Sequence, residues 1–206
     1  EISCSLVGSE MCIRDRLYHW KIYVVGSVEY QYPNHLFQAG YFLDKKYYDE
    51  NTIDFKHLLL SEKNQSLLKD IQNSNSVGVH IRRGDYMTKQ NLVIFGNICT
   101  QKYYHDAIRI ITEKVNDAVF YVFSDDISWV QTHLDIPNAV YVNWNTGESS
   151  IYDMYLMSSC KYNIIANSTF SYWAARLNKK TNMVIYPSKW YNTFTPDIFP
   201  ESWCGI

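Results

Sequence analysis

The sequence contains no long run of apolar residues, no long run of basic residues and no closely spaced pair of cysteines. A membrane-spanning helix needs about 18 consecutive apolar residues, so the sequence predicts no such helix. The net charge of −2 disfavours binding to nucleic acid through bulk electrostatics. The cysteines are scattered and odd in number, which supports neither a disulfide framework nor a zinc site, and a reducing cytoplasm is the expected compartment. They are Cys4, Cys12, Cys99, Cys160 and Cys204.

Apolar and aromatic residues are abundant instead. Hydrophobic residues make up 47% of the 206 residues and charged residues 19%, which predicts a sizeable core and disfavours disorder. The chain carries 18 tyrosines and 6 tryptophans, which suits a protein that stacks planar or sugar ligands, although core packing consumes most aromatic side chains.

Apolar runs alternate with helical patterns along most of the chain, which predicts βαβ units and a parallel sheet. The fold class is therefore α/β, with a Rossmann-like doubly wound parallel sheet and right-handed crossovers. A weaker helical pattern at 54–71 and a short strand at 20–25 precede this region. The predicted strands are 77–81, 119–123, 139–142, 162–166 and 183–186, and the predicted helices are 100–115, 125–134, 150–159 and 169–177.

The first sixteen residues show no pattern that joins them to the rest. They resemble the translation of sequencing-adapter DNA, and we expect residues 1–16 to be a non-native segment, with a genuine N-terminal segment as the alternative.

The end of the first strong strand is the most informative feature. The apolar run 77–81 leads directly into Arg82, Arg83, Gly84 and Asp85. In a parallel sheet such a strand delivers polar groups to the carboxyl edge, where ligands bind. Two guanidinium groups there can form forked hydrogen bonds to a pyrophosphate. The alternatives are a solvated basic turn or an Arg-Asp pair that only locks the loop.

Two further polar clusters follow strands at the same predicted edge. Ser124, Asp125 and Asp126 follow the second strand, and Asn167, Ser168 and Thr169 follow the fourth, where a helix begins. Together with the arginines they predict a nucleoside diphosphate site. The arginines would hold the pyrophosphate, a carboxylate would accept two hydrogen bonds from guanine, and hydroxyls with helix amides would complete the phosphate cage.

Each cluster also has a simpler interpretation. Asp125 and Asp126 are candidates for a helix cap or a manganese-binding pair, and Ser168-Thr169 is an ordinary capping site. His80 fits a structural histidine equally well, and the other histidines show no spacing of a metal site. Residues 83–85 also spell the Arg-Gly-Asp tripeptide of adhesion proteins, a match that is common by chance.

Four stretches in order resemble the α-1,2-fucosyltransferase family, which are inverting, GDP-fucose-dependent glycosyltransferases. The resemblance extends over about residues 20–191, and GNICT at 96–100 and PSKW at 187–190 also fit it. The four stretches are VHIRRGDY at 79–86, FSDDISWV at 123–130, DMYLMS at 153–158 and NIIANSTFSYW at 163–173.

The resemblance implies the donor-binding half of a GT-B-like fold, no cofactor, and metal-independent transfer of L-fucose from GDP-fucose to the 2-hydroxyl of a galactoside. Arg82 would hold the donor diphosphate and Asp126 would read guanine. The predicted catalytic residues are Arg82 and Asp85, the latter as a candidate base that fits a structural ion pair equally well. The predicted donor-binding residues are His80, Arg82, Arg83, Ser124, Asp126, Asn167, Ser168 and Thr169.

One departure from the family pattern affects the domain prediction. Family members open with a glycine-rich Gly-Gly-Leu-Gly-Asn-Gln segment that this sequence lacks. We therefore expect an N-terminally truncated member, in which 17–75 is a remnant of the acceptor-side domain and 76–206 binds GDP-fucose. The alternative is a catalytically incomplete nucleotide-sugar-binding fragment. The expected acceptor is a galactose-terminated glycan or lipid-linked oligosaccharide, reached in the cytoplasm at the inner face of the membrane by peripheral association.

Overall fold

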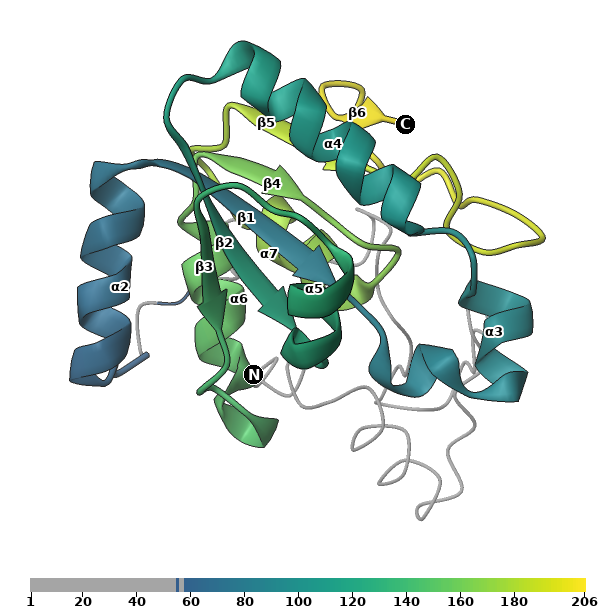
Figure 1. Cartoon of the computed structure of the whole chain (residues 1–206), viewed down its shortest axis with the longest axis horizontal. Helices are drawn as coiled ribbons and strands as arrows, with labels where there is room; N and C mark the ends of the chain where they lie inside the picture. Colours follow the sequence, from purple (N-terminus) through teal and green to yellow (C-terminus); the bar gives the residue numbers. More distant parts are fainter. Residues whose placement is uncertain (1–54, 56–57) are drawn as a thin grey trace, which may run out of the picture.

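A parallel sheet of six strands forms the centre of the molecule (Figure 1). The structure is a computed structural model that describes residue 55 and residues 58–206. The strands lie in the order β3-β2-β1-β4-β5-β6, and every neighbouring pair is parallel. This arrangement confirms the predicted α/β class and the doubly wound parallel sheet. The strands are β1 (Asn75–Ile81), β2 (Ala118–Ser124), β3 (Ala139–Val142), β4 (Tyr162–Ile164), β5 (Met183–Tyr186) and β6 (Cys204–Gly205).

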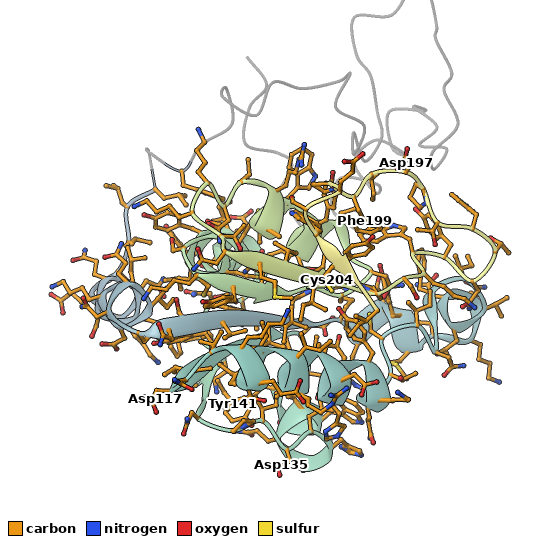
Figure 2. All side chains as sticks on the ribbon, turned by 90° about the horizontal axis from the view of Figure 1, so that it is seen from above. Asp117, Asp135, Tyr141, Asp197, Phe199 and Cys204 are labelled. Atoms are coloured by element: carbon orange, nitrogen blue, oxygen red, sulfur yellow. The ribbon has the colours of Figure 1, made fainter. Side chains whose placement is uncertain are left out.

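Helices cover both faces of the sheet, because the side chains of a buried strand alternate between the two faces. Val79 of β1 packs in the cluster that includes α4 and α5, whereas Tyr121 of β2 packs in the cluster that includes α2, α6 and α7. Figure 2 shows α4 on one side of the sheet and Phe199 on the other. The helices on one face are α4 (Gln101–Lys114) and α5 (Ile127–His133), and those on the other are α2 (Glu62–Asn73), α6 (Ser150–Ser158) and α7 (Thr169–Arg176).

Most predicted elements are present, with small shifts at their ends. The hydroxyl of Thr100 accepts a hydrogen bond from the backbone N–H of Tyr103 at 3.3 Å, which confirms the predicted cap of α4. The helix predicted at 54–71 was placed too early. It begins at Glu62, because the hydroxyl of Ser61 caps it by accepting from the N–H of Asn64 at 3.3 Å.

The sequence did not predict four short elements. These are the 3₁₀ turns η3 (Gly84–Met87) and η4 (Gly147–Ser149), the helix α3 (Lys89–Phe95), and β6. Helix α3 buries none of its side chains, so it carries no apolar periodicity, and β6 is only two residues long.

Several N-terminal predictions lie outside the described residues, including the segment 1–16 and the strand at 20–25. Within the described part, α2 buries Leu67 and Ile71 in the same cluster as residues of α6 and α7. The division of the chain at residues 75 and 76 stays a prediction. No helix in residues 58–206 is long and apolar enough to span a membrane.

The strand order reverses between β1 and β4, and this reversal positions the site. After β3 the chain returns across the sheet to form β4 on the other side of β1, with Val79 opposite Ile164. In doubly wound sheets ligands bind beyond the carboxyl ends of the strands at such a reversal. The residues that follow β1 and β4 flank this position.

Candidate functional site

The polar clusters after β1 and β2 meet at the carboxyl edge of the sheet, as the sequence predicted. The register between the strands sets Ile81 opposite Ser124, so the residues that follow each strand become neighbours. The loop after β1 carries Arg82, Arg83 and Asp85, and the turn after β2 carries Asp125 and Asp126. These five side chains form a network of ion pairs that we call the Arg-Asp cluster.

Arg82 lies between two carboxylates. Its Nη2 contacts Oδ1 of Asp85 at 2.6 Å, and its Nη1 contacts Oδ2 of Asp125 at 3.0 Å. The side chain is 25% exposed, so the charged group is near the surface but partly shielded from water. Two carboxylates on the two terminal nitrogens of one guanidinium fix both the position and the plane of the fork.

Asp125 connects the turn after β2 to the loop after β1 through both of its carboxylate oxygens. Its Oδ1 accepts a hydrogen bond from the backbone N–H of Arg83 at 2.9 Å, while Oδ2 contacts Arg82. A Cβ atom at Gly84 would overlap Oδ2 of Asp125, so any other residue there would force the Asp125 side chain to move. The sequence analysis placed Asp125 in the acidic cluster of the predicted site but left it out of the donor-binding residues, and it did not predict the contact with Arg82.

Arg83 is turned toward α5. Its Nε contacts Oδ2 of Asp126 at 3.3 Å, and its guanidinium lies 3.6 Å from the ring centre of Trp129. The Trp129 ring in turn stacks on His133, with ring centres 4.5 Å apart. A cation over a tryptophan face is held by the ring quadrupole. Trp129 was not predicted, although its place three residues after Asp126 in a helix start could have indicated it.

Asp126 caps α5, one of the alternatives left open by the sequence. Its Oδ1 accepts from the N–H of Trp129 at 3.0 Å, and its own N–H donates to the hydroxyl of Ser124 at 3.0 Å. Capping does not use all the lone pairs of the Asp126 carboxylate, so it does not rule out hydrogen bonds to guanine. The predicted reading of guanine by Asp126 stays a prediction. In the Arg-Gly-Asp tripeptide both charged side chains are engaged, Arg83 by Asp126 and Asp85 by Arg82.

His80 lies near the end of β1, two residues before Arg82, and is buried, with 5% of its surface exposed. Burial, and next the charge of Arg82, lower the pKa of His80 from 6.5 to about 3, so the ring is neutral at pH 7. The ring packs against Phe170, and its Nδ1 has no hydrogen-bond partner in the described part of the chain.

The third predicted cluster lies at the start of α7, and its residues differ in their hydrogen-bond partners. The side-chain amide of buried Asn167 donates to the carbonyl oxygens of Trp190 at 3.0 Å and Phe95 at 3.3 Å. Its backbone carbonyl accepts from the hydroxyl of Tyr86 at 2.9 Å, which ties this loop to the one after β1. Ser168 is the N-terminal cap residue of α7, and its side chain makes no capping hydrogen bond.

A second polar network lies at the same edge, beyond β3. Asn145 donates to Oδ1 of Asp153 at 2.6 Å and to Oδ1 of Asn64 at 3.1 Å, and Nε1 of Trp144 also donates to Asn64 at 2.7 Å. Burial raises the pKa of Asp153 to about 7, against the opposing effect of the Asn145 hydrogen bond. In residues 58–206 no group of three or more His, Cys, Asp or Glu side chains is placed to hold a metal ion.

Asp153 gives the protein a pH-dependent stability. The carboxyl of Asp153 has a higher pKa in the folded than in the unfolded chain, so its stabilising contribution is complete below about pH 4 and is lost as the pH rises through about 7. We expect the difference in unfolding free energy between Asp153→Asn and the wild type to shift in favour of the variant by about 1–3 kcal/mol between pH 4 and 8.

Urea denaturation of both proteins at a series of pH values measures this shift. Asparagine keeps an oxygen that accepts from Asn145, and both proteins keep His80, whose opposite pH dependence cancels in the comparison. A difference that stays constant across this pH range would show that the buried carboxyl has an ordinary pKa.

Comparisons with known proteins agree with the resemblance seen in the sequence. The model of the family described as "Glycosyl transferase family 11" matches residues 19–206. An alpha-1,2-colitosyltransferase of Escherichia coli is 35% identical over 88% of this chain and 63% of its own length. The O-antigen biosynthesis glycosyltransferase WbnK of the same species is 44% identical over 58% of this chain and 40% of its own length.

More distant matches include proteins named as fucosyltransferases. A galactoside alpha-(1,2)-fucosyltransferase 2 of Pongo pygmaeus is 28% identical over 73% of this chain and 48% of its own length. Among solved structures, the fucosyltransferase NodZ from Bradyrhizobium is similar with a TM-score of 0.40 and 18% identity, over 55% of this chain and 39% of that one. The chain spans less than two thirds of the length of the relatives it matches. Because the family model covers nearly the whole sequence, this chain belongs to glycosyl transferase family 11.

Proposed function

We propose that this protein transfers L-fucose from GDP-fucose to the 2-hydroxyl of a galactoside, with inversion at the anomeric carbon and without a divalent metal ion. The observation that carries the proposal is the bracketed guanidinium of Arg82 at the strand-order reversal of the sheet. A planar, permanently charged fork at this position matches the oxygens of a diphosphate. Membership of a glycosyltransferase family supplies the reaction class.

In the proposed complex the donor's diphosphate lies between the loop after β1 and the start of α7. Arg82 faces the diphosphate, and the first N–H groups of α7 point toward the same anion. The hydroxyl of Ser168, which does not cap the helix, supports this arrangement, with Thr169 beside it. The side chains of His80 and Asn167 would support the site indirectly, by holding the loop after β1 and the start of α7 in position.

The proposed reaction is a single displacement. The acceptor oxygen forms a bond to the anomeric carbon as the bond from that carbon to the phosphate oxygen breaks. The anomeric carbon gains oxocarbenium character, and GDP leaves with the bonding electron pair. Arg82 stabilises the charge that develops on the leaving group. The proton of the acceptor hydroxyl passes to a base, for which Asp85 is the candidate.

A second sugar donor is favoured by one relative of this chain. That relative is an alpha-1,2-colitosyltransferase, at 35% identity. Colitose lacks one hydroxyl group of fucose, so the same diphosphate contacts would serve both donors. The acceptor would be a galactose-terminated glycan or lipid-linked oligosaccharide, met at the inner face of the cytoplasmic membrane by peripheral association. The name of the O-antigen biosynthesis relative supports such an acceptor.

Titration and transfer assays test the proposal. We expect calorimetry to detect GDP binding by this chain, and transfer from GDP-fucose to a galactoside, both unchanged in excess EDTA. The reason is that, in the proposed complex, the permanent charge of Arg82 faces the diphosphate and takes the place of a divalent ion. A large loss in EDTA that manganese restores would contradict the metal-free mechanism.

Two further outcomes separate the alternatives. Faster transfer from the colitose donor than from GDP-fucose would favour the second sugar. GDP binding without transfer to any acceptor would favour a catalytically incomplete fragment, because the chain spans less than two thirds of its relatives' length.

A further inference from the structure

The Arg-Asp cluster carries more negative than positive charge. Two guanidiniums face three carboxylates, those of Asp85, Asp125 and Asp126, which leaves one negative charge in excess within the cluster. Both terminal nitrogens of Arg82 already have a carboxylate partner. A diphosphate that approaches this guanidinium therefore meets competing anions, and Coulomb repulsion opposes its binding unless one carboxylate moves away.

The two carboxylates on Arg82 differ in how firmly they are held. Asp125 has three restraints, which are the contact with Arg82, the hydrogen bond from the N–H of Arg83, and the close packing against Gly84. In the part of the chain that the structure describes, the side chain of Asp85 has one partner, Nη2 of Arg82. Asp85 lies in the single turn η3, whose start has no side-chain cap, and its side chain is 32% exposed.

We infer that Asp85 is an internal competitor of the donor: the diphosphate displaces the Asp85 carboxylate from Nη2 of Arg82, while Asp125 keeps Nη1 in place. The inference rests on the proposed function. It makes Asp125 a positioning residue that acts through Arg82. It makes Asp85 a group whose contacts change when the donor binds.

The exchange has a consequence for the reaction. In the ion pair, Oδ1 of Asp85 is held by Nη2 of Arg82 and is not free to contact an acceptor hydroxyl. Once the diphosphate takes its place on Arg82, Asp85 is released next to the bound donor. It then accepts the proton of the acceptor hydroxyl as that oxygen bonds to the anomeric carbon and GDP leaves with the electron pair. The donor must therefore bind before Asp85 can act as the base.

The opposite role for Asp85 leads to the opposite result. If Asp85 served only to hold Arg82 in place, its neutralisation would loosen Arg82 and weaken diphosphate binding. Under the exchange, neutralisation removes a competitor and strengthens binding. The sign of the change therefore decides between the two roles.

The experiment is calorimetric titration of GDP into the wild type, Asp85→Asn and Asp125→Asn. We expect Asp85→Asn to bind GDP about three- to tenfold more tightly, the scale of a partly exposed ion pair. Asp125→Asn removes the same charge from the same guanidinium and is the matched control. We expect it to bind GDP at least about tenfold more weakly, because Asp125 no longer holds the guanidinium of Arg82 in position. Inorganic pyrophosphate should follow the same order, whereas guanosine, which carries no phosphate, should bind all three proteins alike.

The outcomes are distinct. Equal or weaker GDP binding by Asp85→Asn overturns the inference, and so does tighter binding by both variants, since that would reflect only the loss of negative charge. A wild type that binds no GDP overturns the proposed function and the inference together. Urea denaturation of each variant establishes that it is folded, and the prediction for Asp85→Asn stands alone if Asp125→Asn fails to fold. The transfer rate of Asp85→Asn at saturating donor should fall even though its GDP affinity rises, a split that a purely structural role would not produce.

Discussion

Replacing Arg82 by lysine is expected to reduce kcat/KM for transfer by about 30- to 1,000-fold, which corresponds to about 2–4 kcal/mol of transition-state stabilisation. The planar guanidinium of Arg82 reaches Asp85 with one nitrogen and Asp125 with the other. A lysine ammonium is a single point of charge that cannot span both carboxylates and still face a diphosphate. Lysine would keep the charge and lose the fork, so the loss measures geometry rather than charge.

Steady-state kinetics with GDP-fucose, together with GDP titration, measure this effect. Arg109→Lys is the matched control, because Arg109 lies on α4 with 61% of its side chain exposed and pairs only on the surface with Asp106 and Glu113. We expect the control to stay within about twofold of the wild type. Normal GDP affinity and normal turnover in Arg82→Lys would refute the role assigned to Arg82.

Replacing Asn167 by aspartate is expected to destabilise the fold by about 3–5 kcal/mol at pH 7. The Asn167 side chain is buried and donates both amide hydrogens, one to the carbonyl of Trp190 and one to that of Phe95. A carboxylate offers no donors, so two carbonyl oxygens would face a buried negative charge. The loop at the start of α7 would lose its attachment to the C-terminal segment and to α3.

Denaturation in urea at pH 7 and at pH 4.5 measures the loss and its electrostatic part. Acid should recover part of the stability, because a protonated carboxyl can donate one of the two lost hydrogen bonds. Asn182→Asp makes the same chemical change at an exposed residue, and we expect it to alter the stability by less than about 0.5 kcal/mol. If both variants were equally stable, the buried amide of Asn167 would not hold the loop.

Much of the fold was predictable because the buried strands are apolar runs and the helices carry capping residues. The strand 139–142 was placed with its correct ends, and Thr100 was identified as the cap of α4. The meeting of the loops after β1 and β2 was also predictable, since parallel neighbours end at the same edge. The sequence could not predict which neighbour each polar side chain would contact.

The site illustrates that limit. Asp125 and Asp126 are adjacent and chemically identical, yet Asp125 brackets Arg82 while Asp126 caps α5 and holds Arg83. The choice depends on which way each residue points after β2 ends, and on the close approach of Gly84. Asn167 was predicted to bind the donor because it precedes a helix, and that role stays a prediction. The sequence did not indicate that its side chain connects three segments that are distant in the sequence.

The reversal of strand order between β1 and β4 also bears on how the chain folds. The pairs β1–β2 and β2–β3 join strands that follow one another, whereas pairing Val77 with Tyr162 closes a much longer loop. Loop closure costs more entropy as the loop lengthens, so we expect the half of the sheet with β1, β2 and β3 to form first. The hydrogen bond from Tyr86 to the carbonyl of Asn167 crosses the later seam. Under the proposed function, a nucleotide bound at that seam would interact only with completely folded molecules, and we expect it to slow unfolding without accelerating folding.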